Sequence, residues 1–426
     1  MININTTAKY FKKICDNLFL DTRDMEHTIE GITKKLNDTY YNLESDSFSN
    51  MYIVGSVGRK TAIKNCSDLD LLFNMPKEIY KKYDDYDSNG QSALLQDVKK
   101  VLKTRYPKTD IRGDGQVIIL EFTNYTIELV PGFLQKDNKF IYPDTNDGGS
   151  WKYTDPINEQ KACKLAEKKS KGIFCDFCHL IRAWKNQAGF SFKGLLIDSL
   201  VYVYLNDNKF LNDCDYSNYL DILIGLLQFL GNQDPKRKYW YSLGSNQKVY
   251  NKDGAIFVSK AKEALKVLDT SQDKNRALKK LFGGDYPLDE CYHKKYTFDN
   301  TEEFAENKFK IDIRYNLKID AIVIINGFKE YNISEVIRKL SFIRIKRKIR
   351  FYVICTDCPK PYSIYWKVRN VGEIAEKRNM IRGQIVKGND THVEPTSFAG
   401  PHFVECYIIK NGVCVAKDRI DVPIKE

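Results

Sequence analysis

The spacing of apolar residues changes along this chain, and the changes divide it into regions. From residue 5 to residue 42, apolar side chains recur every three or four positions, which predicts helix. Continuous apolar runs at 195–205 and 220–230 predict two buried helices. From residue 309, apolar and polar positions alternate, as in strands with one buried face. The pattern therefore predicts helices early and in the middle, and a separate, mainly β region at the end.

Between the early helices and the middle of the chain lies a pattern that carries chemistry. A short β-prone run ends abruptly at Gly55-Ser56, and residues 67–73 form an apolar run that contains Asp68 and Asp70. Strand side chains two positions apart point to the same face, so the two acids lie side by side. Such acids repel unless a cation lies between them, and Mg²⁺ takes oxygen ligands together with substrate phosphates. Backbone N–H groups of the Gly-Ser turn can approach a triphosphate closely.

A third acid lies inside another apolar strand pattern. Glu128 falls within residues 126–133, whereas its rival Glu121 has a less apolar setting. A helix is expected at 91–105, and a hairpin at 110–121 because an Asp-Gly turn signal separates two β-prone runs. Strands that first alternate with helices and then pair in hairpins predict a small mixed sheet backed by helices.

Composition and charge narrow the class of protein. The chain has 426 residues, of which 42% are hydrophobic and 29% charged, as expected for a globular protein of roughly three domains. No run approaches the roughly 18 apolar residues of a membrane span, and the N-terminus lacks the apolar core of a signal peptide. Eleven cysteines, an odd number, indicate reduced thiols, so we expect a cytoplasmic protein. The net charge of +11 favours acidic partners, namely nucleotides or nucleic acid.

The middle region holds candidate nucleotide contacts, each with a simpler interpretation. Lys185 could neutralise phosphate charge as a point cation, or be an ordinary solvated lysine. Tyr241 could stack on a base and Ser242 could bond to phosphate or ribose, although an aromatic cluster there also suits core packing. The lysine-rich helix at 161–171 is either a solvated face or a nucleic-acid contact. Two Cys-x-x-Cys pairs, at 175–178 and 355–358, fall in different predicted domains, which argues against structural zinc.

The Gly-Ser turn followed by Asp-x-Asp and a later strand acid resembles the polymerase-β type of nucleotidyltransferase fold. More specifically, the chain resembles the bacterial cGAS/DncV-like nucleotidyltransferases, the SMODS group, over about residues 5–290. The motifs that carry this likeness are Gly55-Ser-Val-Gly-Arg-Lys-Thr-Ala-Ile63, Ser67-Asp-Leu-Asp70, Gly90-Gln-Ser92, Ile127-Glu-Leu-Val-Pro131 and Arg182-Ala-Trp-Lys185. Members of this group make second messengers in anti-phage defence.

The resemblance implies roles for particular residues. It implies that Asp68, Asp70 and Glu128 are catalytic and hold two Mg²⁺ or Mn²⁺ ions. The nucleotide contacts that it implies are Gly55, Ser56, Arg59, Thr61, Gln116, Lys185, Tyr241 and Ser242. The implied product is a cyclic di- or trinucleotide made from ATP and/or GTP and read by a downstream effector. An activating RNA on the basic surface is a further expected partner.

The end of the chain has its own resemblance. The segments 365–372, 382–383, 394–396 and 402–407 look like the adenylyl/guanylyl-cyclase-and-SMODS C-terminal (AGS-C) sensor domain, whose family name implies sensing.

The expected fold class is α+β. It combines a polymerase-β-type core at 1–170, a helical lobe that completes the nucleotide cleft at 171–300, and a mainly β domain at 301–426. Two alternatives to a signalling synthase remain open. The first is a weakly active or inactive relative that binds RNA or a partner, and the second is an enzyme that transfers AMP to RNA or protein.

Overall fold

A computed structural model describes residues 4–43, 49–64, 68–123, 125–208, 214–283, 302–324, 331–340 and 342–425. The chain forms two compact units. The first comprises residues 1–183 and 193–265, and the second comprises 184–192 and 266–426. Each unit is described by itself below, and the three-part boundaries expected from the sequence stay a prediction.

The first unit is built on a mixed seven-stranded sheet. Its strands are β1 (Met51–Ile53), β2 (Asp68–Asn74), β3 (Asp110–Asp114), β4 (Val117–Glu121), β5 (Thr126–Leu134), β6 (Phe140–Asp144) and β7 (Ser150–Thr154). The main order is β1-β2-β5-β4-β3, with β6 on β5 and β7 on β6. Only the β2–β5 pair is parallel, and the predicted hairpin at 110–121 is the β3–β4 pair.

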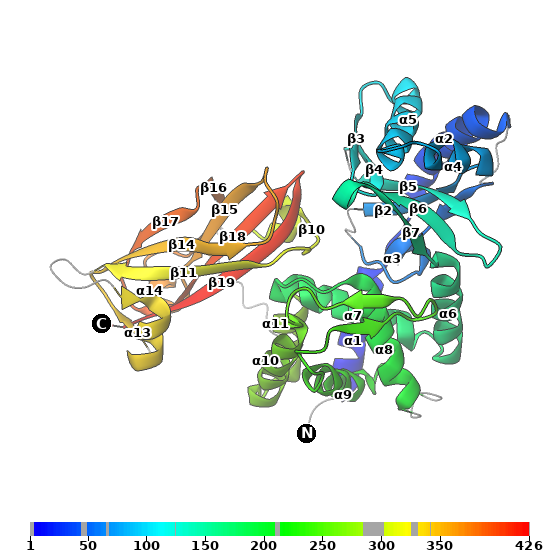
Figure 1. The fold of residues 1–426 in the computed structure, drawn as a ribbon. Helices are drawn as coiled ribbons and strands as arrows, with labels where there is room; N and C mark the ends of the chain where they lie inside the picture. The colour runs from blue at the N-terminus through cyan, green and yellow to red at the C-terminus, as the bar shows by residue number, and fades with distance from the viewer. Residues whose placement is uncertain are drawn as a thin grey trace. The chain divides into compact units, whose positions relative to one another are not determined.

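Three helices pack on this sheet. They are α2 (Arg23–Tyr41), α4 (Lys77–Asp84) and α5 (Gly90–Arg105), and Figure 1 shows them gathered on one side of the strands. Ile29 and Leu36 of α2 and Leu94 of α5 share one buried cluster with Phe73 and Leu129 of the sheet. This apolar face of β2 and β5 fixes their register, because a slip by one residue would bury the acids instead.

Seven further helices belong wholly or partly to the described residues of the first unit. They are α1 (Ile4–Leu18), the short α3 (Gly55–Gly58), α6 (Pro156–Lys169), α7 (Ile173–Ala188), α8 (Gly194–Asp207), α9 (Tyr219–Gly231) and α10 (Ile256–Thr270). Among them, α1, α8 and α9 match the predicted apolar patterns at 5–42, 195–205 and 220–230. Helices α7 and α10 begin in the first unit and end in residues of the second. The sequence also predicts a helix start at Asp155-Pro156, and in the structure Asp155 caps α6 by accepting from Asn158 N while Pro156 takes the first position.

The sequence also predicts loops at 144–151 and 239–246, and both are shorter in the structure. Of the expected loop at 144–151, residues 145–149 connect β6 to β7 and include a short 3₁₀ turn (Asn146–Gly148). The aromatic loop expected at 239–246 begins with β8 (Tyr239–Tyr241), which pairs with β9 (Lys248–Tyr250). Both hairpins join two strands of only three to five residues, too short for a clear period-2 signal.

The second unit is mainly β, as predicted. It contains α11 (Lys274–Phe282), α12 (Ala305–Lys308), β10 (Lys310–Ile311), β11 (Leu317–Ile324), β12 (Tyr331–Asn332), α13 (Ile333–Leu340), β13 (Ile343–Arg344), β14 (Lys348–Thr356), β15 (Ser363–Arg369), α14 (Glu373–Lys377), β16 (Arg382–Gly388), β17 (Thr391–Pro395), β18 (Gly400–Lys410) and β19 (Val413–Lys425).

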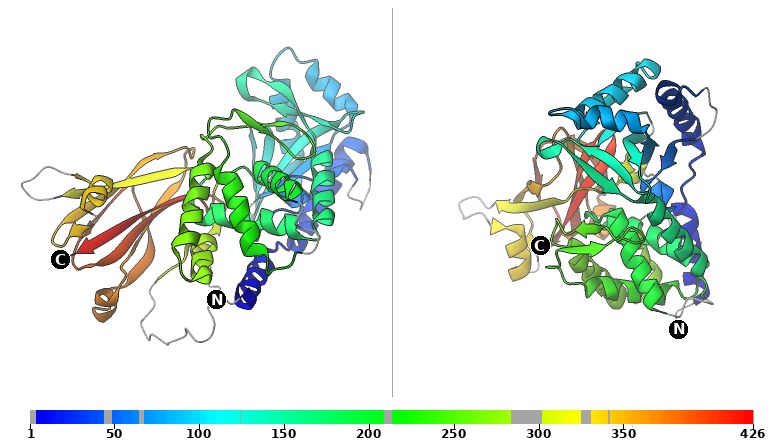
Figure 2. Two further views of the ribbon diagram at one scale, coloured as in Figure 1. Left: turned by 90° about the horizontal axis from the view of Figure 1, so that it is seen from below. Right: turned by 45° about the vertical axis from the view of Figure 1, so that its right-hand side comes forward.

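Its strands form a four-stranded sheet, β12-β11-β14-β17, and a six-stranded sheet, β10-β19-β18-β15-β16 with β13 on β19. The left view of Figure 2 shows the yellow strand β11 of the four-stranded sheet apart from the red strands of the six-stranded sheet. Side chains of both sheets share one buried cluster, including Phe351 of β14 and Trp366 of β15. The Asn411-Gly412 turn signal also predicts a hairpin near the end of the sequence, and the structure has it as β18–β19, with positive φ at both turn residues.

Candidate functional site

The three predicted metal carboxylates lie on neighbouring strands. In the parallel register of β2 and β5, Asp70 is directly opposite Glu128, and Asp68 is opposite Thr126. Asp68, Asp70 and Glu128 are partly exposed, whereas the alternate residues of both strands are buried. The sheet therefore presents all three acids on one face, on strands about 5 Å apart.

The rival acid Glu121 lies farther away. Glu121 lies on β4, opposite Thr126 of β5, and Asp68 lies opposite the same threonine on β2, so β5 separates the two acids. Arg112 Nη1 also pairs with Glu121 Oε1 at 2.6 Å. The register thus favours Glu128 over Glu121 as the acid beside the Asp-x-Asp pair.

The Gly-Ser turn lies directly against the acids. Val54 N donates to Asp70 O at 2.8 Å, and the next residue, Gly55, has a φ of +61°. A Cβ on Gly55 would lie 1.7 Å from Asp70 Oδ2. Glycine is therefore required here twice, for its left-handed backbone and for the close approach to the carboxylate. Ser67, which precedes the acids, lies outside the described residues.

The turn closes on its own backbone. Ser56 O accepts from Thr61 N at 2.9 Å and from Ala62 N at 3.2 Å, and Arg59 N donates to Gly55 O at 3.1 Å. These bonds make residues 55–62 one compact loop between β1 and β2. Ser56 therefore lies directly after Gly55, the residue that approaches the Asp70 carboxylate.

The donor set fits a divalent cation in type. Three carboxylates on one sheet face supply the hard oxygen ligands that Mg²⁺ and Mn²⁺ prefer. Within the part of the chain that the structure describes, no three metal-binding side chains are gathered tightly enough to form a ready-made ion cage. Asp68, Asp70 and Glu128 would therefore adjust their side chains around an ion.

Comparisons with known proteins identify two domains in this chain. The family model for the Second Messenger Oligonucleotide or Dinucleotide Synthetase (SMODS) domain matches residues 6–166, and that for the Adenylyl/Guanylyl and SMODS C-terminal (AGS-C) sensor domain matches 299–425. A probable cyclic nucleotide synthase from Bacillus cereus is 22% identical over 237 residues, covering 46% of this chain and 71% of the relative. A cyclic GMP-AMP synthase from Escherichia albertii is 36% identical over 64 residues, covering 15% of this chain and 14% of the relative.

The fold also has a solved counterpart. The structure of CdnC from an E. coli strain with ATP superposes with a TM-score of 0.52 at 15% identity, covering 66% of this chain and 99% of CdnC. This chain belongs to the CD-NTase nucleotidyltransferases and carries an AGS-C domain. The resemblance inferred from the sequence is thereby confirmed, as is its enzyme class. The family generally uses divalent metal ions.

The structure also bears on two expectations from the sequence, which concern membrane spans and cysteine thiols. None of the helices in the described ranges is long and apolar enough to cross a lipid bilayer. The cysteines of the described residues, Cys175 and Cys178 among them, are free thiols. Burial raises the pKa of the Cys178 thiol well above its usual value, so this side chain behaves as an inert core residue.

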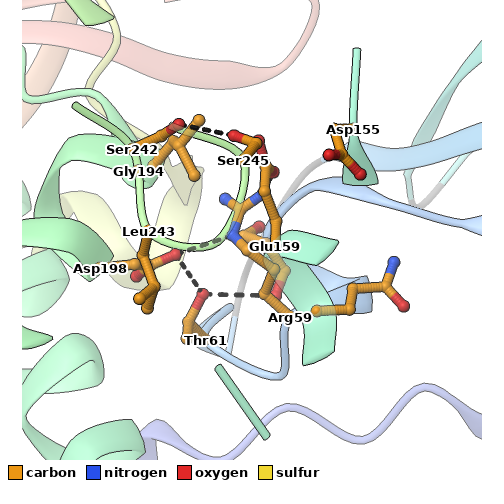
Figure 3. Close-up of polar contacts among 12 residues, drawn as sticks. Arg59, Thr61, Asp155, Glu159, Gly194, Asp198, Ser242, Leu243 and Ser245 are labelled. Carbon is orange, nitrogen blue, oxygen red and sulfur yellow. Dashed lines mark hydrogen bonds and ion pairs between the residues drawn. The ribbon is translucent and has the colours of Figure 1, made fainter. Parts of the chain in front are cut away.

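Arg59 and Thr61 are buried supports of the Gly-Ser turn. Arg59 Nε donates to Asp198 Oδ2 at 2.9 Å, and Thr61 Oγ1 donates to the same oxygen at 3.0 Å. Figure 3 shows both side chains converging on Asp198. Arg59 is 8% exposed and Thr61 is fully buried, so their predicted direct contact with a nucleotide stays a prediction.

Asp198 is the centre of this charge cluster. Burial alone would raise its pKa, but Arg182 and Arg59 outweigh that effect and lower the pKa of Asp198 to about 2. Arg182 Nη1 donates to Asp198 Oδ1 at 2.6 Å. Asp198 is therefore ionised at neutral pH inside a helix that is otherwise strongly apolar.

The cluster extends to the turn after β8. Arg59 Nη1 lies 3.3 Å from Glu159 Oε2, and Ser245 Oγ donates to Glu159 Oε1 at 2.9 Å. Ser245 in turn shares a 2.6 Å hydroxyl bond with Ser242, which is 2% exposed (Figure 3). Tyr241, beside it, is 53% exposed, and its ring packs edge-on against Tyr239. The base and ribose contacts of Tyr241 and Ser242 remain predictions.

Two predicted contacts have other partners. Lys185 belongs to the second unit, where its Nζ donates to Ile313 O at 2.6 Å and lies 3.6 Å from Asp312 Oδ1. It is 8% exposed. A phosphate contact by Lys185 stays a prediction that requires giving up these interactions.

Gln116 lies in the turn between β3 and β4, next to Gly115. Burial would raise the pKa of Asp144, but hydrogen bonds from Asn146 and from the Gln116 side chain outweigh burial and hold the pKa below its usual value. The hydrogen bond to Asp144 therefore connects Gln116 to the end of β6. Its nucleotide contact also stays a prediction.

Asp198 and Glu159 are functional candidates that the sequence motifs did not single out. A signal for Asp198 existed, since a lone acid in the apolar run 195–205 must find a cationic partner when buried. Which cations would meet it could not be read from the sequence, because Arg59 lies 139 positions away.

Proposed function

We propose that this CD-NTase joins nucleoside triphosphates into a cyclic di- or trinucleotide. In each joining step a ribose hydroxyl attacks the α-phosphorus of a second triphosphate, and in the closing step it attacks the triphosphate at the other end of the linear intermediate, each time in line with the leaving group. The new P–O bond replaces the α–β phosphoanhydride bond, pyrophosphate leaves, and the hydroxyl proton passes to solvent or a base. ATP and/or GTP are the proposed substrates, and the CdnC counterpart was solved with ATP.

One observation carries this proposal. Asp70 faces Glu128 across the β2–β5 register, Asp68 shares their face, and Gly55 lies within van der Waals distance of Asp70. A flexible anion such as a triphosphate needs both cationic charge and backbone donors, and this corner of the sheet offers a place for each.

The proposed site residues would have three roles: binding the metal ions, orienting the triphosphate and stacking on a base. Asp68, Asp70 and Glu128 would hold two Mg²⁺ or Mn²⁺ ions, which lower the pKa of the attacking hydroxyl and neutralise phosphate charge. Backbone N–H groups of Gly55 and Ser56 would orient the triphosphate. Tyr241 would stack on a base, because its exposed ring lies near the Ser242–Ser245 turn.

A signalling role in phage defence, known as CBASS, follows as the biological proposal. The product would be read by a downstream effector, and structured RNA is the proposed activator. Its support is the exposed lysine face of α6, which includes Lys161, Lys164 and Lys168. RNA held by such phosphate contacts should dissociate as salt is raised, with a logarithmic slope of about −0.7 to −0.9 per contact.

Incubation with α-labelled nucleoside triphosphates and Mg²⁺ tests the reaction. We expect pyrophosphate release and a labelled product that resists phosphatase, because cyclisation leaves no terminal phosphate. Label transferred to added RNA or to protein would support the AMP transferase instead. No incorporation with or without duplex RNA would support the inactive relative.

A further inference from the structure

We propose that Asp198 is a positioning residue of the nucleotide site. Through Thr61 and Arg59 it fixes the turn that places Gly55 and Ser56 beside the metal carboxylates. This inference rests on the proposed function, since it assigns a role in binding the triphosphate to a residue that contacts no substrate.

The geometry of the turn depends on Asp198 at two points. One oxygen, Oδ2, accepts from both Thr61 Oγ1 at 3.0 Å and Arg59 Nε at 2.9 Å. Thr61 also bonds to Ser56 O through its backbone N–H at 2.9 Å. Thr61 thus connects Asp198 to Ser56: its hydroxyl bonds to the Asp198 carboxylate and its backbone N–H bonds to Ser56 O. Ser56 is a residue whose own N–H would contact the phosphates.

Asp198 is itself held rigidly. Its other oxygen, Oδ1, accepts from Arg182 Nη1 at 2.6 Å, and Arg182 Nη2 donates to Gly194 O at 3.0 Å at the start of α8. The Asp198 side chain is fully buried, so water does not compete for these bonds. A carboxylate held by charge-assisted hydrogen bonds from two guanidinium groups, one on each oxygen, can transmit a position rather than only a charge.

A third bond acts on the same turn from α7. His179 Nε2 lies 3.3 Å from Lys60 O, and burial followed by the nearby Arg182 lowers the pKa of His179 to about 4. The ring is therefore neutral at pH 7 and places no charge near the phosphates. The turn is consequently fastened by groups from two helices, α7 and α8, at three successive residues, Arg59, Lys60 and Thr61.

The same cluster reaches the other side of the proposed nucleotide site. Glu159 accepts from Arg59 and from Ser245, and Ser245 is bonded to Ser242. Leu243 N donates to Ser199 Oγ, which is the residue after Asp198 on α8. The phosphate turn at 55–62 and the turn at 242–247 are thus fixed to a common support, which sets the spacing between phosphates and base.

A matched pair of hydroxyl deletions tests this role. Thr61→Val removes a hydroxyl that donates to buried Asp198, and Tyr219→Phe removes a hydroxyl that donates to Asp176 at 2.7 Å, away from the turn. Because the turn contacts the triphosphate in ground and transition states alike, its displacement should raise KM more than it lowers kcat. We expect KM for the nucleotide to rise about tenfold in Thr61→Val, with kcat within about threefold.

Rescue and charge variants sharpen the result. Thr61→Ser keeps the hydroxyl and should restore KM to within about twofold of the wild type. Asp198→Asn keeps the shape and removes the charge, so it should raise KM at least as far as Thr61→Val does. Tyr219→Phe should lower the melting temperature by a similar amount and leave KM unchanged. Should Asp198→Asn not fold, the Thr61 series still decides the question.

Nucleotide binding separates the failure of this inference from that of the proposed function. Affinity for ATP is measured by calorimetry with Ca²⁺ alongside turnover. A wild type that binds ATP, with Thr61→Val and Tyr219→Phe equal in affinity, overturns the positioning role alone. A wild type that binds ATP but forms no product overturns the proposed reaction, while weaker binding by Thr61→Val still supports the positioning role. A wild type that neither binds nor reacts overturns both.

Discussion

Each of the two units contains a cluster of buried charges, and the clusters differ in what they adjoin. In the first unit, Asp198 is fully buried between Arg59 and Arg182. In the second, Lys367, 4% exposed, lies 2.9 Å from Glu302 and 3.4 Å from Glu405. Both clusters join segments that are far apart in the sequence.

The difference lies in their neighbours. The Asp198 cluster bonds to the turn that contacts Asp70 and to the Ser242–Ser245 turn. It therefore adjoins residues of the proposed nucleotide site. The Lys367 cluster bonds to Glu302, the first residue of the described segment before α12, and Glu303 N donates to Gly383 O nearby. It fastens an entering segment to the six-stranded sheet. A buried ion pair therefore says little about function until its neighbours are known.

The largest effect should come from the acids themselves. The double variant Asp68→Asn and Asp70→Asn should lower kcat/KM for nucleotide incorporation by about a thousandfold or more, because it removes ligands for the ions. Thermal unfolding should be unchanged or shifted upward, since two like charges on one strand are removed. Turnover near that of the wild type would contradict the metal assignment.

Breaking the second cluster should reduce stability and leave chemistry intact. Lys367→Met leaves Glu302 and Glu405 without this cation and should lower the free energy of unfolding of the second unit by about 3 kcal/mol. Lys377→Met, at an exposed pair with Glu373 in the same unit, is the control and should cost less than about 1 kcal/mol. Urea unfolding measures both, and equal costs would show that the Lys367 cluster is not a structural anchor.

The first cluster should make stability depend on acid. The folded pKa of Asp198, about 2, lies below its unfolded value, so its contribution is complete above roughly pH 5 and is lost as pH falls toward 2. From the size of that shift, the contribution at neutral pH is about 2 kcal/mol. Glu159 acts in the opposite direction, because burial raises its pKa despite the opposing Arg59. The stability difference between wild type and Asp198→Asn should therefore narrow between pH 7 and pH 2, and a constant difference would contradict the linkage.

Lys185 offers the smallest and sharpest comparison. Lys185→Met removes a 2.6 Å bond to Ile313 O and should destabilise the second unit by about 1–2 kcal/mol, with ATP affinity changed less than about threefold. Lys260→Met, which removes an exposed pair with Glu263, is the control. Unchanged stability together with weaker ATP binding would instead support the phosphate contact predicted for Lys185.

The sequence predicted what depends on local pattern. The Asp-x-Asp strand, the hairpin at Asp114-Gly115 and the β18–β19 hairpin at Asn411-Gly412 follow from period and turn chemistry, and the structure has all three. The pairing of Asp70 with Glu128 was harder to predict from the sequence, because the register of two parallel strands is set by the packing of their apolar faces.

Partners of buried charges were not predictable. The resemblance implied that Arg59 and Lys185 contact a nucleotide, with a solvated lysine as the alternative for Lys185, and it gave neither side chain a partner within the protein. In the structure, Arg59 contacts Asp198 and Glu159, while Lys185 contacts the Asp312 carboxylate and the Ile313 carbonyl. The residues in these contacts are 100 or more positions apart in the sequence, so only the folded chain reveals them.

The most direct test of the central claim is a crystal structure of the protein with Mn²⁺ and an ATP analogue that cannot be cleaved between the α- and β-phosphates. The anomalous signal of Mn²⁺ locates each ion independently of the protein density. The account predicts Mn²⁺ bound by Asp68, Asp70 and Glu128, with the triphosphate against the N–H groups of Gly55 and Ser56. Mn²⁺ and triphosphate bound at another set of residues, with these three acids uncoordinated, would contradict it.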